Sequence, residues 1–99
     1  MSQQSATWPE GHYSVVRTYS AGVHVGIVTV RAGTEAVLSK ARRLWSWKGA
    51  NTLHEVALRG VASGSRVSEE VDGILLTGVI EVIPCTAEAE RNLRGGRWS

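Results

Sequence analysis

The sequence predicts one small α+β domain, in which an antiparallel sheet of four to five strands carries one or two short helices, in the order β-β-β-α-β-β-α. Segments rich in Val, Ile, Thr and Tyr alternate with short turns, which is typical of strands joined by hairpins. Two stretches, beginning at Thr52 and Thr86, combine a helix-capping residue with a following run of helix formers. The 99 residues allow one domain, and no internal repeat divides them.

Regular structure is expected over residues 13–94, as a single domain. Residues 1–12 are expected to form a flexible N-terminal arm, and residues 95–99 a C-terminal tail. The N-terminal segment contains Trp8, and the C-terminal segment contains Trp98. We expect these two rings to become ordered only against a pocket or a partner.

The first two strands are predicted over residues 13–19 and 22–31, with Ser20-Ala21-Gly22 as the tight turn of a hairpin. Side chains alternate between the two faces of a strand. In the second strand we expect Val23 and every second residue after it to face the core, and His24 and its set to face away from it.

The third element is predicted to run from Glu35 to about Trp47. Thirteen residues are long for one straight strand, so the length indicates a bulge or a bend. Residues 36–45 are also compatible with a helix, because Ala, Leu, Lys and Arg are good helix formers. The sequence leaves both alternatives open.

The first helix is predicted at Thr52-Leu53-His54-Glu55, which has the spacing of a capping box. We expect it to run to Arg59 and to end at Gly60, because glycine accepts the left-handed conformation that closes a helix.

The second half of the chain is dominated by the aliphatic run Ile74–Pro84, which predicts one central or interface strand. Residues 66–71 are expected to pair beside it as a shorter edge strand. Thr86 is expected to begin a last helix that extends through about Leu93, with Gly95-Gly96 ending it.

Charge is distributed unevenly along the chain. The net charge is +2, but residues 17–59 hold seven basic and two acidic residues, a net +5, whereas the remainder holds four basic and seven acidic residues, a net −3. A basic front half favours an anionic partner. An acidic back half is also suited to pair with the basic half of a second copy, so a homo-oligomer is expected.

Several classes of protein are not favoured by the sequence. Cys85 is the only cysteine, which excludes an internal disulfide. The N-terminus has no signal-peptide pattern, and no apolar run approaches the ~20 residues of a spanning helix. We expect a cytoplasmic protein without membrane attachment. Because the histidines are far apart and no Gly-x-Ser-x-Gly elbow exists, we expect no enzyme activity, no metal site and no cofactor.

The segment most suggestive of function is residues 39–50, where four cations and two tryptophans are close together. Arginine forks match phosphate oxygens, and tryptophan faces stack on bases. In an extended chain Arg43, Trp45 and Trp47 share one face, and the amides that open the helix at Thr52 are a further anion contact. With the hydroxyl-rich turn included, the candidate ligand-binding residues are Tyr19, Ser20, Arg42, Arg43, Trp45, Trp47 and Lys48.

A purely structural interpretation competes with this one. In that case one tryptophan fills the core, the other closes a subunit contact, and the arginines pair with Glu69, Glu70 and Asp72.

The motifs Arg17–His24, Ala41–Ala50 and Ile80–Pro84 resemble those of a family of small proteins that tailed bacteriophages often carry and that has no established activity. The resemblance covers about residues 13–94 and implies a phage setting. The chain departs from the family's pattern at residues 72–73, where Pro-Glu is usual, and at residues 78–79, where Glu-Ala is common. These departures leave the basic motifs intact.

Two functions follow as hypotheses. The first is a non-catalytic phage protein that sequesters a small anionic ligand, such as a nucleotide or a cyclic-nucleotide signal of host defence, in the host cytoplasm during infection. The alternative is a virion decoration or assembly protein that binds a capsid protein through its tryptophans and the aliphatic strand. Binding of DNA or of a host protein remains a third possibility, although no DNA-reading motif supports it.

Overall fold

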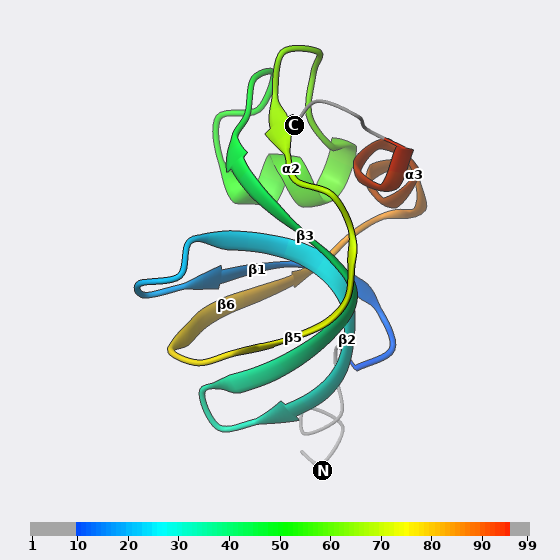
Figure 1. Cartoon of the computed structure of the whole chain (residues 1–99). Helices are drawn as coiled ribbons and strands as arrows, with labels where there is room; N and C mark the ends of the chain where they lie inside the picture. The colour runs from blue at the N-terminus through cyan, green and yellow to red at the C-terminus, as the bar shows by residue number, and fades with distance from the viewer. Residues whose placement is uncertain (1–9, 96–99) are drawn as a thin grey trace, which may run out of the picture.

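The computed structural model describes residues 10–95 and shows an antiparallel sheet with two helices packed at one end of it (Figure 1). The α+β class is confirmed. Trp8 and Trp98, and with them most of the two predicted end segments, lie outside the described residues. The elements in chain order are β1 (Tyr13–Thr18), β2 (Val23–Ala32), β3 (Glu35–Ser46), α2 (Leu53–Arg59), β4 (Arg66–Val67), β5 (Val71–Leu76), β6 (Val79–Pro84) and α3 (Ala87–Gly95).

The sheet has six strands rather than the four to five predicted, and the element order is β-β-β-α-β-β-β-α. The prediction was wrong because the run Ile74–Pro84 is not one strand. Gly78 adopts a positive φ of 69° and turns the chain, so the run divides between β5 and β6. The predicted edge strand over residues 66–71 is only the two-residue β4.

The strand order is β4-β3-β2-β1-β6, and β5 pairs with β3 beside β4. The long third element is a strand, so the helical alternative is excluded. Its register against β2 slips by one residue between the pairs Ile27↔Ser39 and Val25↔Arg42. Lys40 lies within this slip and has a positive φ of 51°, which is typical of a bulge. The predicted bend in this strand is therefore confirmed.

The sheet is strongly curved and buries apolar side chains on both faces. On the convex face, β1 and β2 pack against the helices in a cluster that includes Val15, Val25, Val56 and Leu93. On the concave face, a second cluster is enclosed by the sheet itself, with β5 and β6 contributing to it. This second cluster consists of Val16, Val28, Ala36, Leu38, Ala41 and Leu76.

Burial on both faces corrects one expectation about β2. His24 was expected to face away from the core, yet only 6% of its surface is exposed. Val28, from the same alternating set, is fully buried in the concave cluster. The curvature of the sheet covers this face, which a period of two in the sequence does not reveal.

Both helices begin at their predicted caps, and α2 ends at Gly60 as predicted, whereas α3 continues past Leu93 to Gly95. The Glu55 amide donates to the Thr52 hydroxyl at 3.3 Å, and the Asn51 amide donates to the Glu55 carboxylate at 2.6 Å. At the start of α3, the Ala89 amide donates to the Thr86 hydroxyl at 3.1 Å. Neither helix of the described residues is long and apolar enough to cross a membrane.

The N-terminal residues 10–12 are held against β2. The Gly11 amide donates to the Val28 carbonyl at 2.6 Å, and the Val28 amide donates to the His12 carbonyl at 3.1 Å. A carboxylate oxygen of Glu10 accepts from the Arg31 amide at 3.0 Å. Residues 10–12 were expected to belong to the N-terminal arm, but these hydrogen bonds join them to β2 as a continuation of β1.

Candidate functional site

The basic and aromatic segment lies at the end of β3, where the strand changes neighbours. β3 pairs with β2 from Glu35 to Leu44, with β5 from Ala36 to Ala41, and with β4 from Leu44 to Ser46. The strand is therefore held from both sides up to Leu44 and from the β4 side beyond it. The positions from which its side chains project are thus set by the pairing of the backbone.

The bulge at Lys40 determines which side chains share a face. Before it, Leu38 points into the concave cluster; after it, Ala41 does so, and the alternation continues through Arg43 and Trp45. Leu44 points to the other face, where it is 1% exposed in the helix-side cluster. The expected pairing of Arg43 with Trp45 on one face is thus present in the structure.

Arg42 is buried on the helix side, with 8% of its surface exposed. Its Nε donates to the Ser68 carbonyl at 2.7 Å, and its Nη1 donates to the carbonyls of Leu93 and Arg94 at 2.8 and 3.1 Å. These last two carbonyls belong to the end of α3, where a cation is favourable. Arg42, a predicted ligand-binding residue, thus ties α3 to the sheet.

Arg43 is exposed on the opposite face. Its amide donates to the Ser68 hydroxyl at 2.7 Å, and its carbonyl accepts from the Ser68 amide at 2.9 Å. The guanidinium lies over the β1–β2 hairpin, so close that a Cβ atom at Gly22 would be 3.0 Å from its Nη2. Ser68 thus fixes the backbone of Arg43, and the side chain lies against the hairpin.

His24 is the cross-strand partner of Arg43 in β2. Its Nδ1 is buried and has no hydrogen-bond partner among the described residues. Burial and then the neighbouring Arg43 cation lower the pKa of His24 below its ordinary value of 6.5. The ring is therefore neutral at physiological pH, and it adds no charge next to Arg43.

Trp45 is 54% exposed, although a surface indole of this size is usually better buried. The Arg66 guanidinium, from β4, lies 5.4 Å from the centroid of its ring, in a cation–π contact. Arg43, Trp45 and Ser68 line a shallow hollow of about 370 Å³. We call the surface formed by Arg43, Trp45, Arg66 and Ser68 the Trp45 face.

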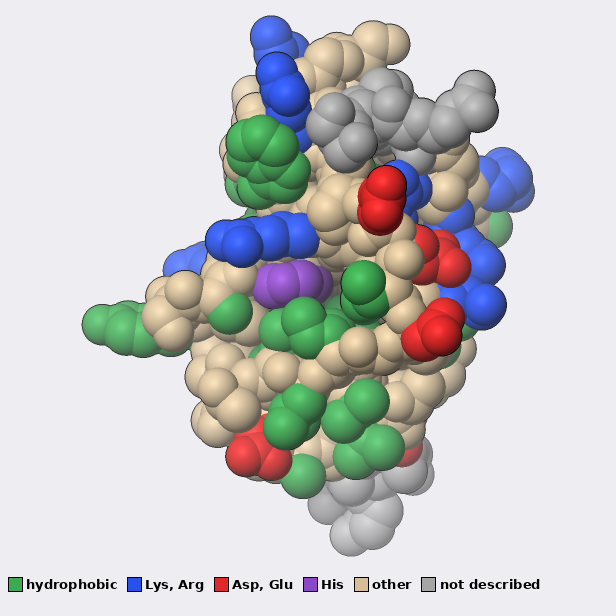
Figure 2. Space-filling model, in the orientation of Figure 1, with side chains coloured by type: hydrophobic (Ala, Val, Ile, Leu, Met, Phe, Trp, Pro, Cys, Tyr) green, Lys and Arg blue, Asp and Glu red, His purple; other side chains and the backbone are tan. Residues whose placement is uncertain are grey.

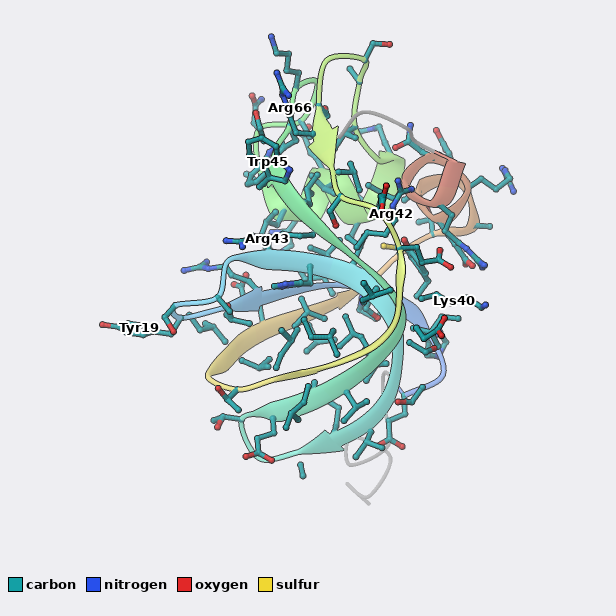
Figure 3. The ribbon with its side chains drawn as sticks, in the orientation of Figure 1. Tyr19, Lys40, Arg42, Arg43, Trp45 and Arg66 are labelled. Atoms are coloured by element: carbon teal, nitrogen blue, oxygen red, sulfur yellow. The ribbon has the colours of Figure 1, made fainter. Side chains whose placement is uncertain are left out.

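Arg43 and Arg66 have no carboxylate within ion-pair distance in the described part of the chain, where the ion pairs join Arg17 to Glu81, Arg59 to Glu55 and Arg94 to Glu90. For Arg43, the described residues therefore show none of the ion pairs with Glu69, Glu70 and Asp72 that the structural interpretation expects. Figure 3 shows Arg66, Trp45 and Arg43 one below another. In Figure 2 basic side chains without acidic neighbours lie at the upper left, whereas those at the right edge lie beside acidic side chains.

Trp47 is separated from Trp45, because β3 ends at Ser46. Its ring is half-buried against the helix-side cluster and lines a second hollow, of about 490 Å³. We call this the hairpin hollow, since it lies between the β1–β2 hairpin and α2. Its lining residues are Arg17, Thr18, Gly22, Val23, Trp47, Asn51, Thr52, Leu53, His54 and Glu81.

The hairpin residues of the predicted site lie away from both hollows. Tyr19 is 85% exposed at the tip of the hairpin and points away from Arg43 and Trp45 (Figure 3). Its amide donates to the Gly78 carbonyl at 2.8 Å, which joins the hairpin to the β5–β6 turn. Ser20 is exposed beside it and lines neither hollow.

Lys48 is exposed in the loop after β3. Its amide donates to the Ser65 hydroxyl at 2.9 Å, and the aliphatic part of its side chain lies near Gly64. The helix amides expected to meet an anion are in part already used, because those of Asn51 and Glu55 bond within the α2 cap. The predicted cluster therefore divides, and its centre is Arg43 with Trp45.

Sequence reasoning missed three members of this region: Arg66, Ser68 and His24. Arg66 is 21 positions after Trp45, and only the pairing of β4 with β3 brings it onto the indole ring. No local pattern marks it. Among residues 10–95, no three His, Cys, Asp or Glu side chains come together as a metal site.

Comparison with known proteins identifies a family and nothing closer. No curated protein and no solved structure matches this chain. One family model matches residues 11–93, which covers both hollows and almost all of the described structure. The chain therefore belongs to the family named DUF6948, a domain of unknown function.

Proposed function

We propose that the protein binds a small anionic ligand with a flat ring, such as a nucleotide, on the Trp45 face. The observation that carries the proposal is an indole more than half exposed between two arginines that have no carboxylate partner among the described residues. An exposed ring beside cations that have no acidic partner suits a ligand that is both planar and anionic.

The chemistry of each group supports this ligand class. Guanidinium forks bind phosphate oxygens in a bidentate manner, and a base stacked on an aromatic side chain contributes about 1 to 3 kcal/mol. The backbone of Arg43 is fixed by Ser68 and its guanidinium lies beside Gly22, so the strand presents this cation next to Trp45. The cross-strand neighbour of Arg43, His24, is neutral, so it carries no charge that would alter the attraction between Arg43 and an anionic ligand.

The proposed role is sequestration without catalysis. Binding alone requires only the cations and the ring that the Trp45 face presents. The resemblance to phage proteins supports a setting in the infected host's cytoplasm, where a nucleotide or cyclic-nucleotide signal of host defence is a ligand of the required chemistry.

Isothermal titration calorimetry with a panel of nucleoside monophosphates and cyclic mononucleotides tests the proposal. At least one nucleotide should bind, and both Arg43→Ala and Trp45→Ala should abolish the heat signal. Lys48→Ala is the matched control, because Lys48 is exposed nearby but does not line the hollow. Absence of binding by every member of the panel, or equal loss in the control, would contradict the proposal.

A second function is favoured by a row of apolar side chains on the convex face. Val30 pairs with Val37 in the next strand, and Val37 pairs with Leu75 in the one after it. Val30 and Leu75 are 50% and 59% exposed. Such a row is suited to an interface in a homo-oligomer or with a capsid protein. Sedimentation of the purified protein, and its presence in or absence from purified virions, decides this candidate.

A further inference from the structure

We infer that the ligand carries two rings joined through phosphate, as a dinucleotide does, with the first ring on Trp45 and the second in the hairpin hollow. This inference rests on the proposed function, because it assigns a ligand class to the same site. It arises from the position of Arg43, which lines the hollow beside Trp45 and whose guanidinium lies next to Gly22, a residue that lines the hairpin hollow.

The hairpin hollow has the chemistry of a ring site rather than a phosphate site. Its apolar wall is formed by Val23, Trp47 and Leu53, all half-buried. Its one arginine, Arg17, already faces the carboxylate of Glu81, with Nη1 and Oε1 3.5 Å apart. The hollow is therefore close to neutral, with an aromatic surface to stack on and a carboxylate able to accept from the amino group of a base.

Arg43 connects this hollow to the Trp45 face. Gly22 lines the hairpin hollow, and a Cβ atom built there would lie 3.0 to 3.5 Å from three atoms of the Arg43 guanidinium group. Arg43 also lines the hollow beside Trp45. Arg43 thus lines the hollow that holds Trp45 and lies next to a residue that lines the hollow of Trp47.

This arrangement matches the covalent order of a dinucleotide, which is ring, phosphate, ring. A mononucleotide would occupy the Trp45 face and leave the second hollow empty. The two hollows, at about 370 and 490 Å³, are together of the size that ligand pockets of about 300 to 1,000 Å³ require. The second ring should add stacking energy without a further charge.

The test compares three probes by titration calorimetry for each of the four bases: the nucleoside 5′-monophosphate, the nucleoside 3′,5′-bisphosphate, and the linear dinucleotide with a 5′-phosphate. The bisphosphate has both phosphates but only one ring. We expect the dinucleotide of at least one base to bind about tenfold or more tighter than both other probes, the effect of one further stacked ring.

Two variants locate the second ring. Trp47→Leu keeps an apolar side chain against the core, and His54→Trp introduces a bulky ring at an exposed position that lines the hollow. Each should reduce dinucleotide affinity to the mononucleotide level and leave the mononucleotide affinity unchanged. Because His54 is exposed, its variant remains informative if Trp47→Leu fails to fold.

The outcomes separate this inference from the proposed function. Binding of monophosphates with no advantage for the dinucleotide overturns the inference and leaves the proposed function in place. A dinucleotide advantage that the bisphosphate reproduces, or that both variants retain, also overturns the inference. If none of the three probes binds, the inference is wrong, and if the cyclic mononucleotides also fail to bind, the proposed function is wrong as well.

Discussion

Arg42 and Arg43 are adjacent in sequence, but their replacement should have different effects on stability. Loss of Arg42 should lower the free energy of unfolding strongly, and loss of Arg43 should barely change it. Arg42 is buried, and its guanidinium donates to the carbonyls of Ser68, Leu93 and Arg94 at 2.7 to 3.1 Å. Arg42→Leu removes these charge-assisted hydrogen bonds and leaves carbonyls at the end of α3 without their donor. Arg43→Ala removes an exposed side chain whose strand is held by backbone contacts to Ser68.

The magnitudes follow from these contacts. Hydrogen bonds to a charged group contribute about 1.5 to 3 kcal/mol each, and partial access of water to the freed carbonyls reduces the sum, so Arg42→Leu should lower the free energy of unfolding by about 3 to 5 kcal/mol. Exposed substitutions without such contacts cost less than about 1 kcal/mol. A loss of 3 kcal/mol corresponds to a fall in Tm of roughly 12 °C or more in a domain of this size.

Urea unfolding followed by circular dichroism measures both variants against the wild type. Arg42→Lys, which retains the charge but not the planar fork, should fall between the wild type and Arg42→Leu. If Arg42→Leu costs less than about 1 kcal/mol, or if Arg43→Ala costs as much, the assignment of Arg42 to the fold and of Arg43 to the site is refuted.

Three further predictions follow from single residues. Gly22→Ala, at a φ of 86° and with Arg43 3.0 Å from the new Cβ, should cost more stability in thermal melts than Gly33→Ala, which has a φ of 58° and no atom within 4 Å; equal costs would contradict the contact. The pKa of His24 is lowered in the folded protein, so below about pH 6.5 the unfolded chain binds more protons than the native one and the free energy of unfolding should fall. The fall should be smaller in His24→Gln. The same dependence of stability on pH in both proteins would contradict this cause. Burial raises the pKa of the Cys85 thiol to about 12, so it should react slowly with a disulfide reagent at pH 8 until denaturant is added; rapid reaction in the native state would contradict the burial.

Much of the local structure could be predicted from the sequence because it depends on hydrogen bonds between residues close together in the chain. The capping box at Thr52 and Glu55, the turn before Gly22 and the stop at Gly60 each involve residues at most four positions apart. The class of fold followed from β-branched segments and turn residues. The strand count did not, because the aliphatic run Ile74–Pro84 contains no polar break strong enough to mark the turn at Gly78.

The candidate site was predicted in composition but not in arrangement. The sequence identified Arg43 and Trp45 and placed them on one face, as the structure has them. It also grouped them with Arg42, which lies on the other face, and with Trp47, which lines a different hollow. A regular alternation cannot foresee where a strand ends or which carbonyls a buried guanidinium will meet.

The sequence by itself determined which groups are present: a basic front half, two tryptophans beside two arginines, and strands and helices whose ends are specified by local hydrogen bonds. Only the tertiary structure decided how they meet. The bulge at Lys40 shifts the alternation of β3 by one residue, which brings Arg43 and Trp45 to the face that carries His24. Pairing of β4 with β3 then brings Arg66 onto the Trp45 ring. Both depend on hydrogen bonds between distant segments, and such long-range contacts leave no periodic pattern in the sequence.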